Sequence, residues 1–329
     1  MQVLRAAQRA HLFAGAMAAC AVALAGAPTA LAQPADKTIK IIYPFPAGSA
    51  GDTLSRVAAN YMQAKLGRSV VVENRSGAGG ITGIRSVVAS DGDGSILLVA
   101  PSATVTMIPI YNPDAGYDAK KDLKPISHLV SQDLALGVGP ALPAKSLKEL
   151  IEIVRKDPSK GSYGTPGAGS SLHLIGVKLG QVADIKMVPV HYRGASLALN
   201  DVIAGQLPMI LSPMPDQIEQ HRAGKVRILV TAGAQRSSFL DNVPTLTESG
   251  IDINAMGWFA AFAPAALSND LAEKYAKLFT EAVQQPESKV ILNNIGFIPV
   301  GTAPAVLQAL VNRDLSFWAP IFKSSGFRN

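Results

Sequence analysis

The sequence predicts an α/β protein built from two similar units. Short apolar runs alternate with amphipathic helical segments from residue 38 to residue 322, a pattern typical of mostly parallel sheets covered by helices. The alternation starts again near Ser131, and a chain of 329 residues is long enough for two domains. Two such units predict a ligand cleft between them, because ligands of open α/β sheets bind beyond the carboxyl ends of the strands.

The first unit is expected to begin with a strand that Pro44 and Pro46 end. Gly67 ends the helix that follows, because glycine readily adopts the left-handed conformation of a helix C-terminus. Residues 111–124 are rich in Asn, Pro, Asp and Gly and are expected to form a loop. The predicted strands of this half are 38–43, 69–73 and 95–100, and the predicted helices are 52–66 and 77–90.

In the second unit, Ser146 followed three residues later by Glu149 predicts a capped helix start. Gly205 is expected to end the last helix of this half. The predicted strands are 134–138, 161–165, 187–190, 207–211 and 226–232, and the predicted helices are 146–156, 171–182 and 195–204. The tail is expected to return as strand 258–263 and helices 269–284 and 304–322.

The first 32 residues have the features of a secretory signal peptide. Arg5, Arg9 and His11 precede an apolar run over 12–27, and 30–32 offers a small-x-small cleavage pattern. We therefore expect a cleavable leader and a periplasmic protein. The single cysteine, Cys20, lies in this leader, so thiolate metal sites and cysteine nucleophiles are excluded from the exported chain. Residues 17–20 loosely resemble a lipoprotein box, but the apolar run continues to residue 27, which argues against lipidation.

Composition excludes several classes of partner. Lys and Arg number 30 against 24 Asp and Glu, and the basic residues are scattered without a stripe of interleaved aromatics, so no nucleic-acid partner is expected. Histidines and acids show no metal-ligand spacing, and no phosphate-loop motif occurs. We expect no metal and no cofactor, and a monomer is the default expectation.

Three turns consist of small residues placed between a strand and a helix. At such junctions free backbone N–H groups and the helix dipole favour an anion. The turns lie at 47–51, 77–80 and 167–171. They predict a site for a small carboxylate, although small residues also simply permit tight turns.

Individual residues near these turns have more than one interpretation. Ser49 has the surroundings of a nucleophile elbow, which keeps an exported serine hydrolase as an alternative. Asp52 either contacts ligand or stabilises its helix N-terminus, and His173 either contacts ligand or caps the turn. Arg193 could hold a carboxylate through two hydrogen bonds or be a solvated surface arginine. Gly77-x-Gly79 after a strand suggests a dinucleotide fingerprint, but Thr82 occupies the place of the third glycine.

The order of several motifs resembles the Bug family, the extracytoplasmic substrate-binding proteins of tripartite tricarboxylate transporters. The likeness includes Pro44-Phe45-Pro46-Ala47-Gly48 with Asp52, and it covers nearly the whole chain after the leader. Further matching motifs are Val72-Glu73-Asn74-Arg75, Gly77-Ala78-Gly79-Gly80, Gly167-x-Gly169-Ser170-Ser171-x-His173, Tyr192-Arg193-Gly194-Ala195, Ala223-Gly224-Lys225 and Val243-Pro244-Thr245.

The resemblance implies a two-domain periplasmic binding protein of type II topology, a clamshell with its ligand cleft between the domains. It implies a non-enzymatic solute-binding protein that captures a small di-, tri- or aromatic carboxylate and delivers it to a tripartite tricarboxylate-type membrane permease. A ligand sensor for a signalling partner uses the same clamshell and stays open as an alternative. We expect domain 1 to comprise residues 33–130 and 254–329, and domain 2 to comprise 131–253.

The resemblance places ligand contacts on the loops at 45–49 and 165–171. The chain departs from the family pattern at Ser212, where many members carry an acid, so we expect a ligand without an ammonium group. The candidate ligand-binding residues are Phe45, Ala47, Gly48, Ser49, Asp52, Gly79, Ser102, Thr165, Ala168, Gly169, Ser170, His173, Arg193, Gly194 and Ser212. No catalytic residue is expected.

Overall fold

The computed structural model describes residues 37–192 and 194–325. The predicted signal peptide at residues 1–32 lies outside the described residues, and so does Arg193.

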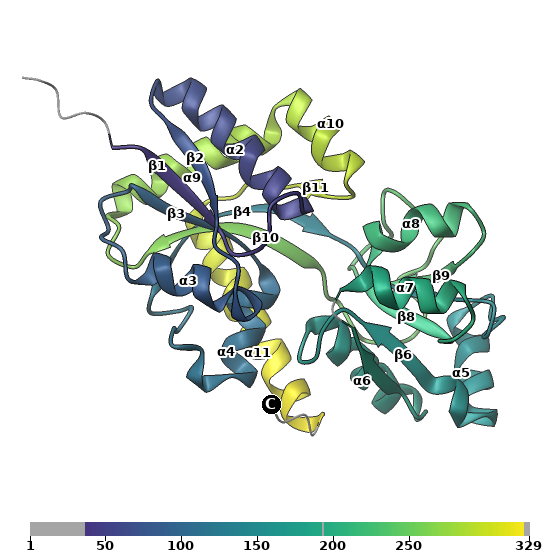
Figure 1. Ribbon diagram of the computed structural model, residues 1–329. Coiled ribbons are helices and arrows are strands. Elements are labelled where there is room, and N and C mark those ends of the chain that lie inside the picture. Colours follow the sequence, from purple (N-terminus) through teal and green to yellow (C-terminus); the bar gives the residue numbers. More distant parts are fainter. Residues whose placement is uncertain (1–36, 193, 326–329) are drawn as a thin grey trace, which may run out of the picture. The chain divides into compact units, whose positions relative to one another are not determined.

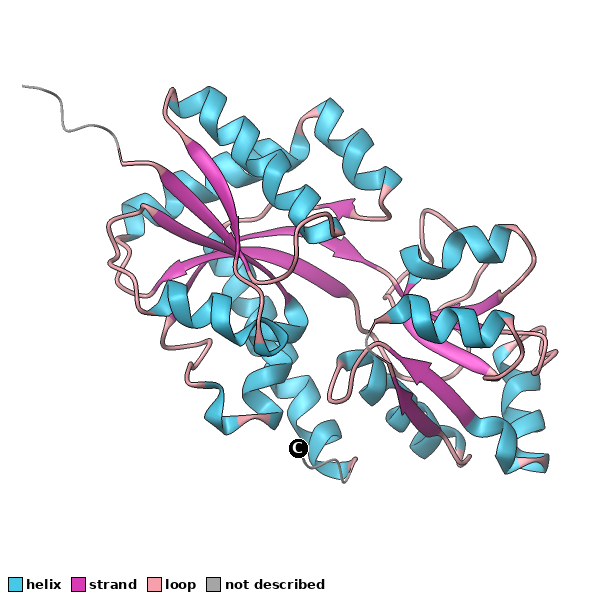
Figure 2. Ribbon diagram, in the orientation of Figure 1, coloured by secondary structure: helices cyan, strands magenta, loops and turns pink. Residues whose placement is uncertain are grey.

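The described strands form one six-stranded and one five-stranded sheet (Figures 1 and 2). The six-stranded sheet has the order β11-β4-β10-β3-β1-β2. Its strands are β1 (Ile39–Tyr43), β2 (Val70–Asn74), β3 (Ile96–Pro101), β4 (Leu123–Gln132), β10 (Gly257–Pro264) and β11 (Ile298–Pro299). The five-stranded sheet has the order β7-β6-β8-β5-β9. Its strands are β5 (Leu134–Val138), β6 (Ser162–Thr165), β7 (Val188–His191), β8 (Met209–Pro213) and β9 (Arg227–Thr231).

Both sheets are mixed, so the prediction of mostly parallel sheets was wrong. β1 pairs in parallel with β2 and β3, whereas β10 lies between β3 and β4 and is antiparallel to both. β4 leads directly into β5 of the other sheet, and β10 returns the chain from it. A strand that returns from the second sheet enters the first sheet from the opposite end and therefore pairs antiparallel. A run of apolar residues does not indicate in which direction a strand runs, so the sequence alone could not predict this pairing. The domain boundaries expected at residues 130 and 254 stay a prediction.

Helices cover both faces of each sheet (Figure 1). The described α-helices are α2 (Ala50–Leu66), α3 (Ile81–Val88), α4 (Ile108–Tyr111), α5 (Leu147–Lys156), α6 (Ser171–Ala183), α7 (Ala195–Ile203), α8 (Met214–Arg222), α9 (Asn269–Gln284), α10 (Pro286–Asn294) and α11 (Pro304–Ser324). In the six-stranded sheet, Ile39 and Ile41 pack with α2 and α9, whereas Ile42 and Leu98 pack with α3 and α11, because alternate strand residues point to opposite faces. In the five-stranded sheet, α5 and α6 share one face and α7 and α8 pack on the other.

The strand β4 was not predicted, and it begins at Leu123 inside the segment expected to be a loop. Its sequence mixes Lys, Pro, Ser and His with apolar residues, so it lacks a simple strand pattern. The polar side chains of β4 find hydrogen-bond partners in the fold. His128 Nε2 lies 3.0 Å from Ser131 Oγ, and Ser127 Oγ accepts the N–H of Thr302 at 3.0 Å. Tertiary pairing on both sides therefore outweighs weak local propensity.

Serine side chains cap the starts of α5, α6 and α9, and the cap at Ser146 of α5 was predicted. The Oγ of Ser146, Ser170 and Ser268 each accepts the N–H of the residue three positions later, at 3.2–3.3 Å. In a capping box, the Glu149 side chain would accept the N–H of the cap residue, Ser146. Here Glu149 Oε2 instead accepts the N–H of Lys145, the preceding residue, at 2.8 Å. The helices α8 and α10 were not predicted, and both begin beside a proline in the first turn.

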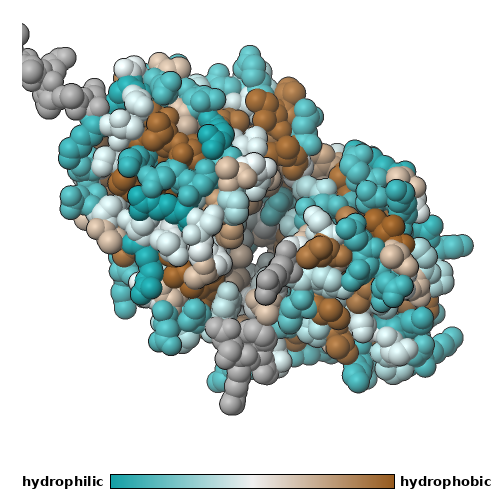
Figure 3. All heavy atoms as spheres, in the orientation of Figure 1, coloured by the Kyte–Doolittle hydropathy of each residue, from teal (hydrophilic) through white to brown (hydrophobic). Residues whose placement is uncertain are grey.

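The face of the molecule in Figure 3 is covered mostly by hydrophilic side chains, with hydrophobic ones gathered in small patches. Across residues 37–192 and 194–325, none of the helices combines the length and the apolar character needed to cross a bilayer.

Candidate functional site

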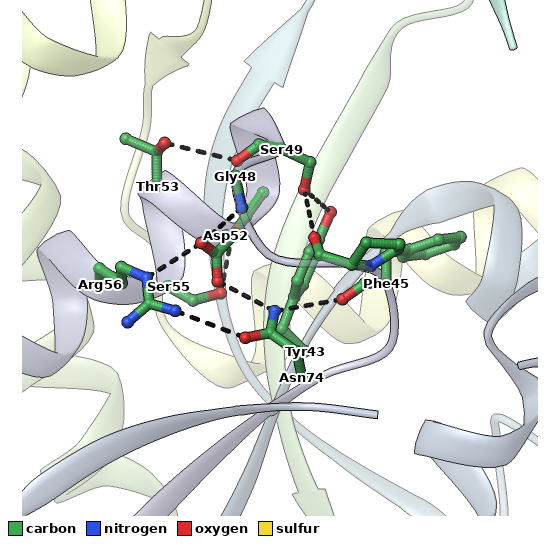
Figure 4. Close-up of polar contacts among 11 residues, drawn as sticks. Tyr43, Phe45, Gly48, Ser49, Asp52, Thr53, Ser55, Arg56 and Asn74 are labelled. Atoms are coloured by element: carbon green, nitrogen blue, oxygen red, sulfur yellow. Dashed lines mark hydrogen bonds and ion pairs between the residues drawn. The ribbon is translucent and has the colours of Figure 1, made fainter. Parts of the chain in front are cut away.

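The turn between β1 and α2 is organised around the carboxylate of Asp52 (Figure 4). Its Oδ2 accepts from the N–H of Gly48 at 3.0 Å and from Arg56 Nε at 2.9 Å, and its Oδ1 accepts from Asn74 Nδ2 at 2.9 Å. Asn74 Nδ2 also donates to the carbonyl of Phe45 at 3.1 Å. Asp52 thus holds the loop 45–49 in place, because its carboxylate oxygens accept hydrogen bonds from donors of the protein.

Electrostatics keep this carboxylate ionised. Burial alone would raise the pKa of Asp52, but the hydrogen bonds from Arg56, Gly48 and Asn74 and the charge of Arg56 outweigh it and hold the pKa below its usual value. Asp52 is 3 % exposed, whereas Ala47 and Gly48 are exposed residues. The charge therefore lies beneath a turn of small residues at the surface.

Ser49 ends this turn as the residue before α2. Its Oγ lies 3.0 Å from Tyr43 Oη and 3.3 Å from the carbonyl of Pro46. Gly51 has no room for a side chain, because a Cβ there would lie 2.4 Å from Tyr43 Oη. The side chain of Tyr43, which the sequence did not single out, therefore packs directly against the N-terminus of α2.

The turns after β2 and β3 meet this first turn. Gly77, Gly79 and Gly80 all have positive φ, and so does Ala78 at 45°, a conformation that favours glycine. A Cβ at Gly80 would lie 2.8 Å from Thr104 and 3.4 Å from the ring of Phe45. Three strand ends of the six-stranded sheet therefore converge on Phe45.

Ser102 follows β3, where the chain enters a short π-helical turn over Ala103–Met107. The carbonyl of Ser102 accepts from Thr106 Oγ1 at 2.8 Å, and Tyr117 Oη donates to the carbonyl of Thr104. The expectation of a helix that opens at residue 77 was wrong by four residues, because positive φ values at the glycines delay regular helix until Ile81.

The turn between β6 and α6 is the corresponding feature of the five-stranded sheet. Ser170 Oγ accepts the N–H of His173 at 3.2 Å and donates to the carbonyl of Gly167 at 2.8 Å. Thr165 Oγ1 lies 3.3 Å from the same Oγ. Gly169 donates its N–H to His173 Nδ1 at 3.2 Å, so both ends of this turn are tied to the first turn of α6.

His173 is 3 % exposed and serves this turn as an acceptor. Burial, followed by the neighbouring His191, lowers the pKa of His173 to about 4. The two rings meet edge to face with 4.8 Å between their centroids. Because Nδ1 accepts a hydrogen bond, the neutral ring carries its proton on Nε2.

Tyr111 connects the two sets of turns. A Cβ at Gly169 would lie 2.8 Å from the ring of Tyr111, which follows β3 of the other sheet and stacks on Phe322 of α11 at 6.1 Å. Nothing in the sequence around Tyr111 indicated this contact, because the residue begins a segment that was expected to be a loop.

Ala168 is exposed within the turn between β6 and α6. Ser212 and Gly194 are not joined to either turn by hydrogen bonds between described residues. Ser212 is fully buried, and its Oγ donates to the carbonyl of Pro213 at 3.1 Å and accepts from Gln217 Nε2 at 3.0 Å. Gly194 is partly exposed at the start of α7. Arg193 belongs to the residues that the structure does not describe.

Asp216 is an ionisable residue of α8 that sequence analysis did not single out. Its side chain is accessible to solvent, yet protein atoms surround the carboxyl group closely enough that burial raises its pKa to about 6. In the part of the chain that the structure describes, no group of three or more His, Cys, Asp or Glu side chains is placed to hold a metal ion.

Comparison with known proteins places this geometry in a family. Residues 54–327 match the family described as "Tripartite tricarboxylate transporter family receptor". The chain is 30 % identical over 295 residues to Protein BugT of Bordetella pertussis, covering 88 % of this chain and 90 % of BugT.

Two solved structures show the same fold. The periplasmic binding protein BugD is 27 % identical, with a TM-score of 0.75, over 89 % of this chain and 99 % of BugD. A protein of R. palustris solved with adipate is 25 % identical, with a TM-score of 0.77, over 88 % of this chain and 97 % of that chain. The fold is therefore the two-domain, type II-like fold of periplasmic binding proteins, and the chain belongs to the tripartite tricarboxylate transporter receptor family, which includes the Bug proteins.

Proposed function

We propose that this chain is a periplasmic receptor that binds a small organic carboxylate and delivers it to a tripartite tricarboxylate-type membrane permease. The observation that carries the proposal is the pair of hydrogen-bonded turns at the N-termini of α2 and α6, one from each sheet. The R. palustris relative solved with adipate, a dicarboxylate, supports this ligand class.

Each turn offers the groups that a carboxylate needs. The first N–H groups of α2 and α6 have no partner within their helices, and the helix dipole favours negative charge at that end. Asp52 accepts the N–H of Gly48, and His173 accepts the N–H of Gly169. These bonds hold the two turns in place and so preorganise the first N–H groups of α2 and α6. We infer that ligand contacts to both turns stabilise a closed state, which the permease recognises.

The contacts of Ser49 favour a receptor over a serine hydrolase. A catalytic serine needs a general base within hydrogen-bond reach. Among the described residues, the hydrogen-bond partners of Ser49 Oγ are Tyr43 Oη and the carbonyl of Pro46, and neither is a base at neutral pH. We therefore propose that the chain turns over no substrate.

A thermal-shift screen of the chain from residue 33 onward tests this function. The panel comprises C4–C8 dicarboxylates, tricarboxylates, aromatic acids, and amino acids paired with their des-amino analogues. An organic acid at about 100 times its dissociation constant should add roughly 2.7 kcal/mol to the free energy of unfolding. We expect the response to be confined to one subclass of acids without an ammonium group, in line with Ser212.

A preference for an amino acid over its des-amino analogue would contradict the ammonium-free ligand. No response across the panel, before and after refolding to remove co-purified ligand, would contradict the carboxylate receptor itself. Hydrolysis of a p-nitrophenyl ester that disappears in Ser49→Ala would instead establish the hydrolase.

A further inference from the structure

A cavity lies on the five-stranded sheet, and none of the turns described above lines it. Residues 138–145, at the end of β5 and beyond it, form one wall, and residues 221–227, at the end of α8 and the start of β9, form the other. The volume is about 590 Å³, within the range of small-molecule sites. No candidate ligand-binding residue lines it. We call it the basic pocket.

The charged side chains that line the basic pocket are all positive. Lys145, Lys225 and Arg227 line it and are exposed. Within residues 37–192 and 194–325, none of these three cations forms an ion pair, and no Asp or Glu lines the pocket. Three uncompensated charges around one cavity attract a multivalent anion, which removes their mutual repulsion.

The acid next to this pocket in sequence does not neutralise it. Glu149 lies one helical turn after Lys145, but its Oε2 accepts from the backbone N–H of Lys145 at 2.8 Å rather than from the ammonium group. Glu149 thereby caps α5 and leaves the Lys145 side chain available.

His221 adds a neutral donor. Its Nδ1 accepts the N–H of Ile228 at 3.1 Å, so the neutral ring carries its proton on Nε2. Burial lowers the pKa of His221, and the positive charges of Arg227 and Arg222 lower it further, against an opposing backbone hydrogen bond to Val226. The pocket therefore combines three cations with an imidazole N–H.

The base of the basic pocket is apolar. Pro140 and Pro143 line it and are exposed, and they lie over the buried Val138, Leu142 and Val226. A bare phosphate ion gains nothing from such a surface, whereas the carbon chain of an organic acid loses unfavourable contact with water there. The lining therefore favours an organic anion over an inorganic one.

We propose that the basic pocket is a second anion-binding site, which takes an organic acid with two or three carboxylate groups. Its cations hold the carboxylates and its apolar base contacts the carbon chain. The site is independent of the two turns at α2 and α6, so occupancy of one does not require the other.

NMR of isotopically labelled protein tests the basic pocket apart from the receptor site. Propane-1,2,3-tricarboxylate is titrated while the amide signals of Gly139 and Gly224 report on the basic pocket and those of Gly167 and Gly169 report on the turn at α6. We expect saturable shifts of the first pair and an affinity at least about tenfold lower in the triple variant K145Q/K225Q/R227Q. That factor corresponds to about 0.5 kcal/mol for each ion pair lost.

The matched control K274Q/K277Q/K289Q removes three exposed lysines from α9 and α10, so it has the same net charge as the pocket variant. Its affinity should equal that of the wild type. Absence of shifts at Gly139 and Gly224, equal weakening in both variants, or an equal affinity for inorganic phosphate would overturn the proposal. Binding of a glutamate-rich peptide in place of the tricarboxylate would also overturn it and would identify a protein-docking surface.

Discussion

Asp52 illustrates how a residue can determine a binding turn without offering its own charge to a ligand. An acid in the first turn of a helix is consistent with either a dipole-stabilised cap or a ligand contact. In the structure its two oxygens serve Gly48, Arg56 and Asn74, which come from the loop, the helix and the neighbouring strand. Its role as a direct ligand contact stays a prediction, and its role in shaping the turn follows from these bonds.

Replacing Asp52 by alanine should therefore destabilise the protein. The change leaves the donors of Gly48 and Asn74 without their acceptor, which costs about 1–3 kcal/mol of unfolding free energy. Asp270→Ala is the matched control, because Asp270 also lies in the first turn of a helix but is exposed and should cost only about 0.3–1 kcal/mol through the dipole. Urea unfolding measures both variants, and equal losses would show that the dipole alone explains Asp52.

At the scale of elements, the residue that caps α6, Ser170, also belongs to a loop that is predicted to bind ligand. Ser170 caps the helix through the N–H of His173 and also bonds to Gly167 within the loop. The cap is visible in the sequence, because serine precedes an apolar helical segment. The bond from Gly169 to the His173 ring is not visible, because it depends on a buried side chain reaching back four residues.

Two serine caps allow the cap and the binding role to be separated. Ser170→Ala and Ser268→Ala each remove an N-cap acceptor and should each lower the free energy of unfolding by about 0.5–2 kcal/mol. Only Ser170→Ala should also weaken carboxylate binding, by about 1–3 kcal/mol. Calorimetric titration with the acid identified by thermal shift measures this, and unchanged affinity in Ser170→Ala would remove the turn at α6 from the site.

At the scale of the whole molecule, the fold keeps two histidines neutral, one in the strand β4 and one in the helix α6. His173 has its pKa lowered to about 4 by burial and by His191. His128 of β4 also has its pKa lowered to about 4, by burial first and also by the charge of Arg313, against an opposing hydrogen bond to Val130. Between pH 6.5 and 4 the unfolded chain binds more protons at these histidines than the folded chain does.

The free energy of unfolding should therefore fall as the pH is lowered through this window. Each histidine contributes at most about 1.4 kcal/mol per pH unit to the slope. His173→Asn keeps an acceptor near the place of Nδ1 but does not titrate, so it should flatten the profile, and His128→Asn should flatten it again by a separate amount. Urea unfolding at pH 4–7 measures these slopes. A variant profile parallel to that of the wild type would show that His173 titrates normally in the folded protein.

Local patterns predicted much of the secondary structure and part of the candidate site. Gly67 ends α2 in the left-handed conformation with its N–H on the carbonyl of Gln63, and Ser146 caps the start of α5. These features depend on residues within one helical turn of each other, so the sequence contains the whole interaction. The order of several motifs along the chain likewise indicated the family to which it belongs.

By itself, then, the sequence determined the alternation of strands and helices, their main boundaries and the family. Tertiary structure alone decided that β4 is a central strand and that β10 pairs antiparallel beside it. It also decided that Asp52 bonds to Asn74 and that Tyr111 packs on Gly169, contacts between residues 22 and 58 positions apart. The physical reason is the distance along the chain over which each interaction acts. Helix caps and C-terminal glycines interact with residues a few positions away, whereas strand direction and the partners of buried polar groups depend on which distant segments the folded core brings together.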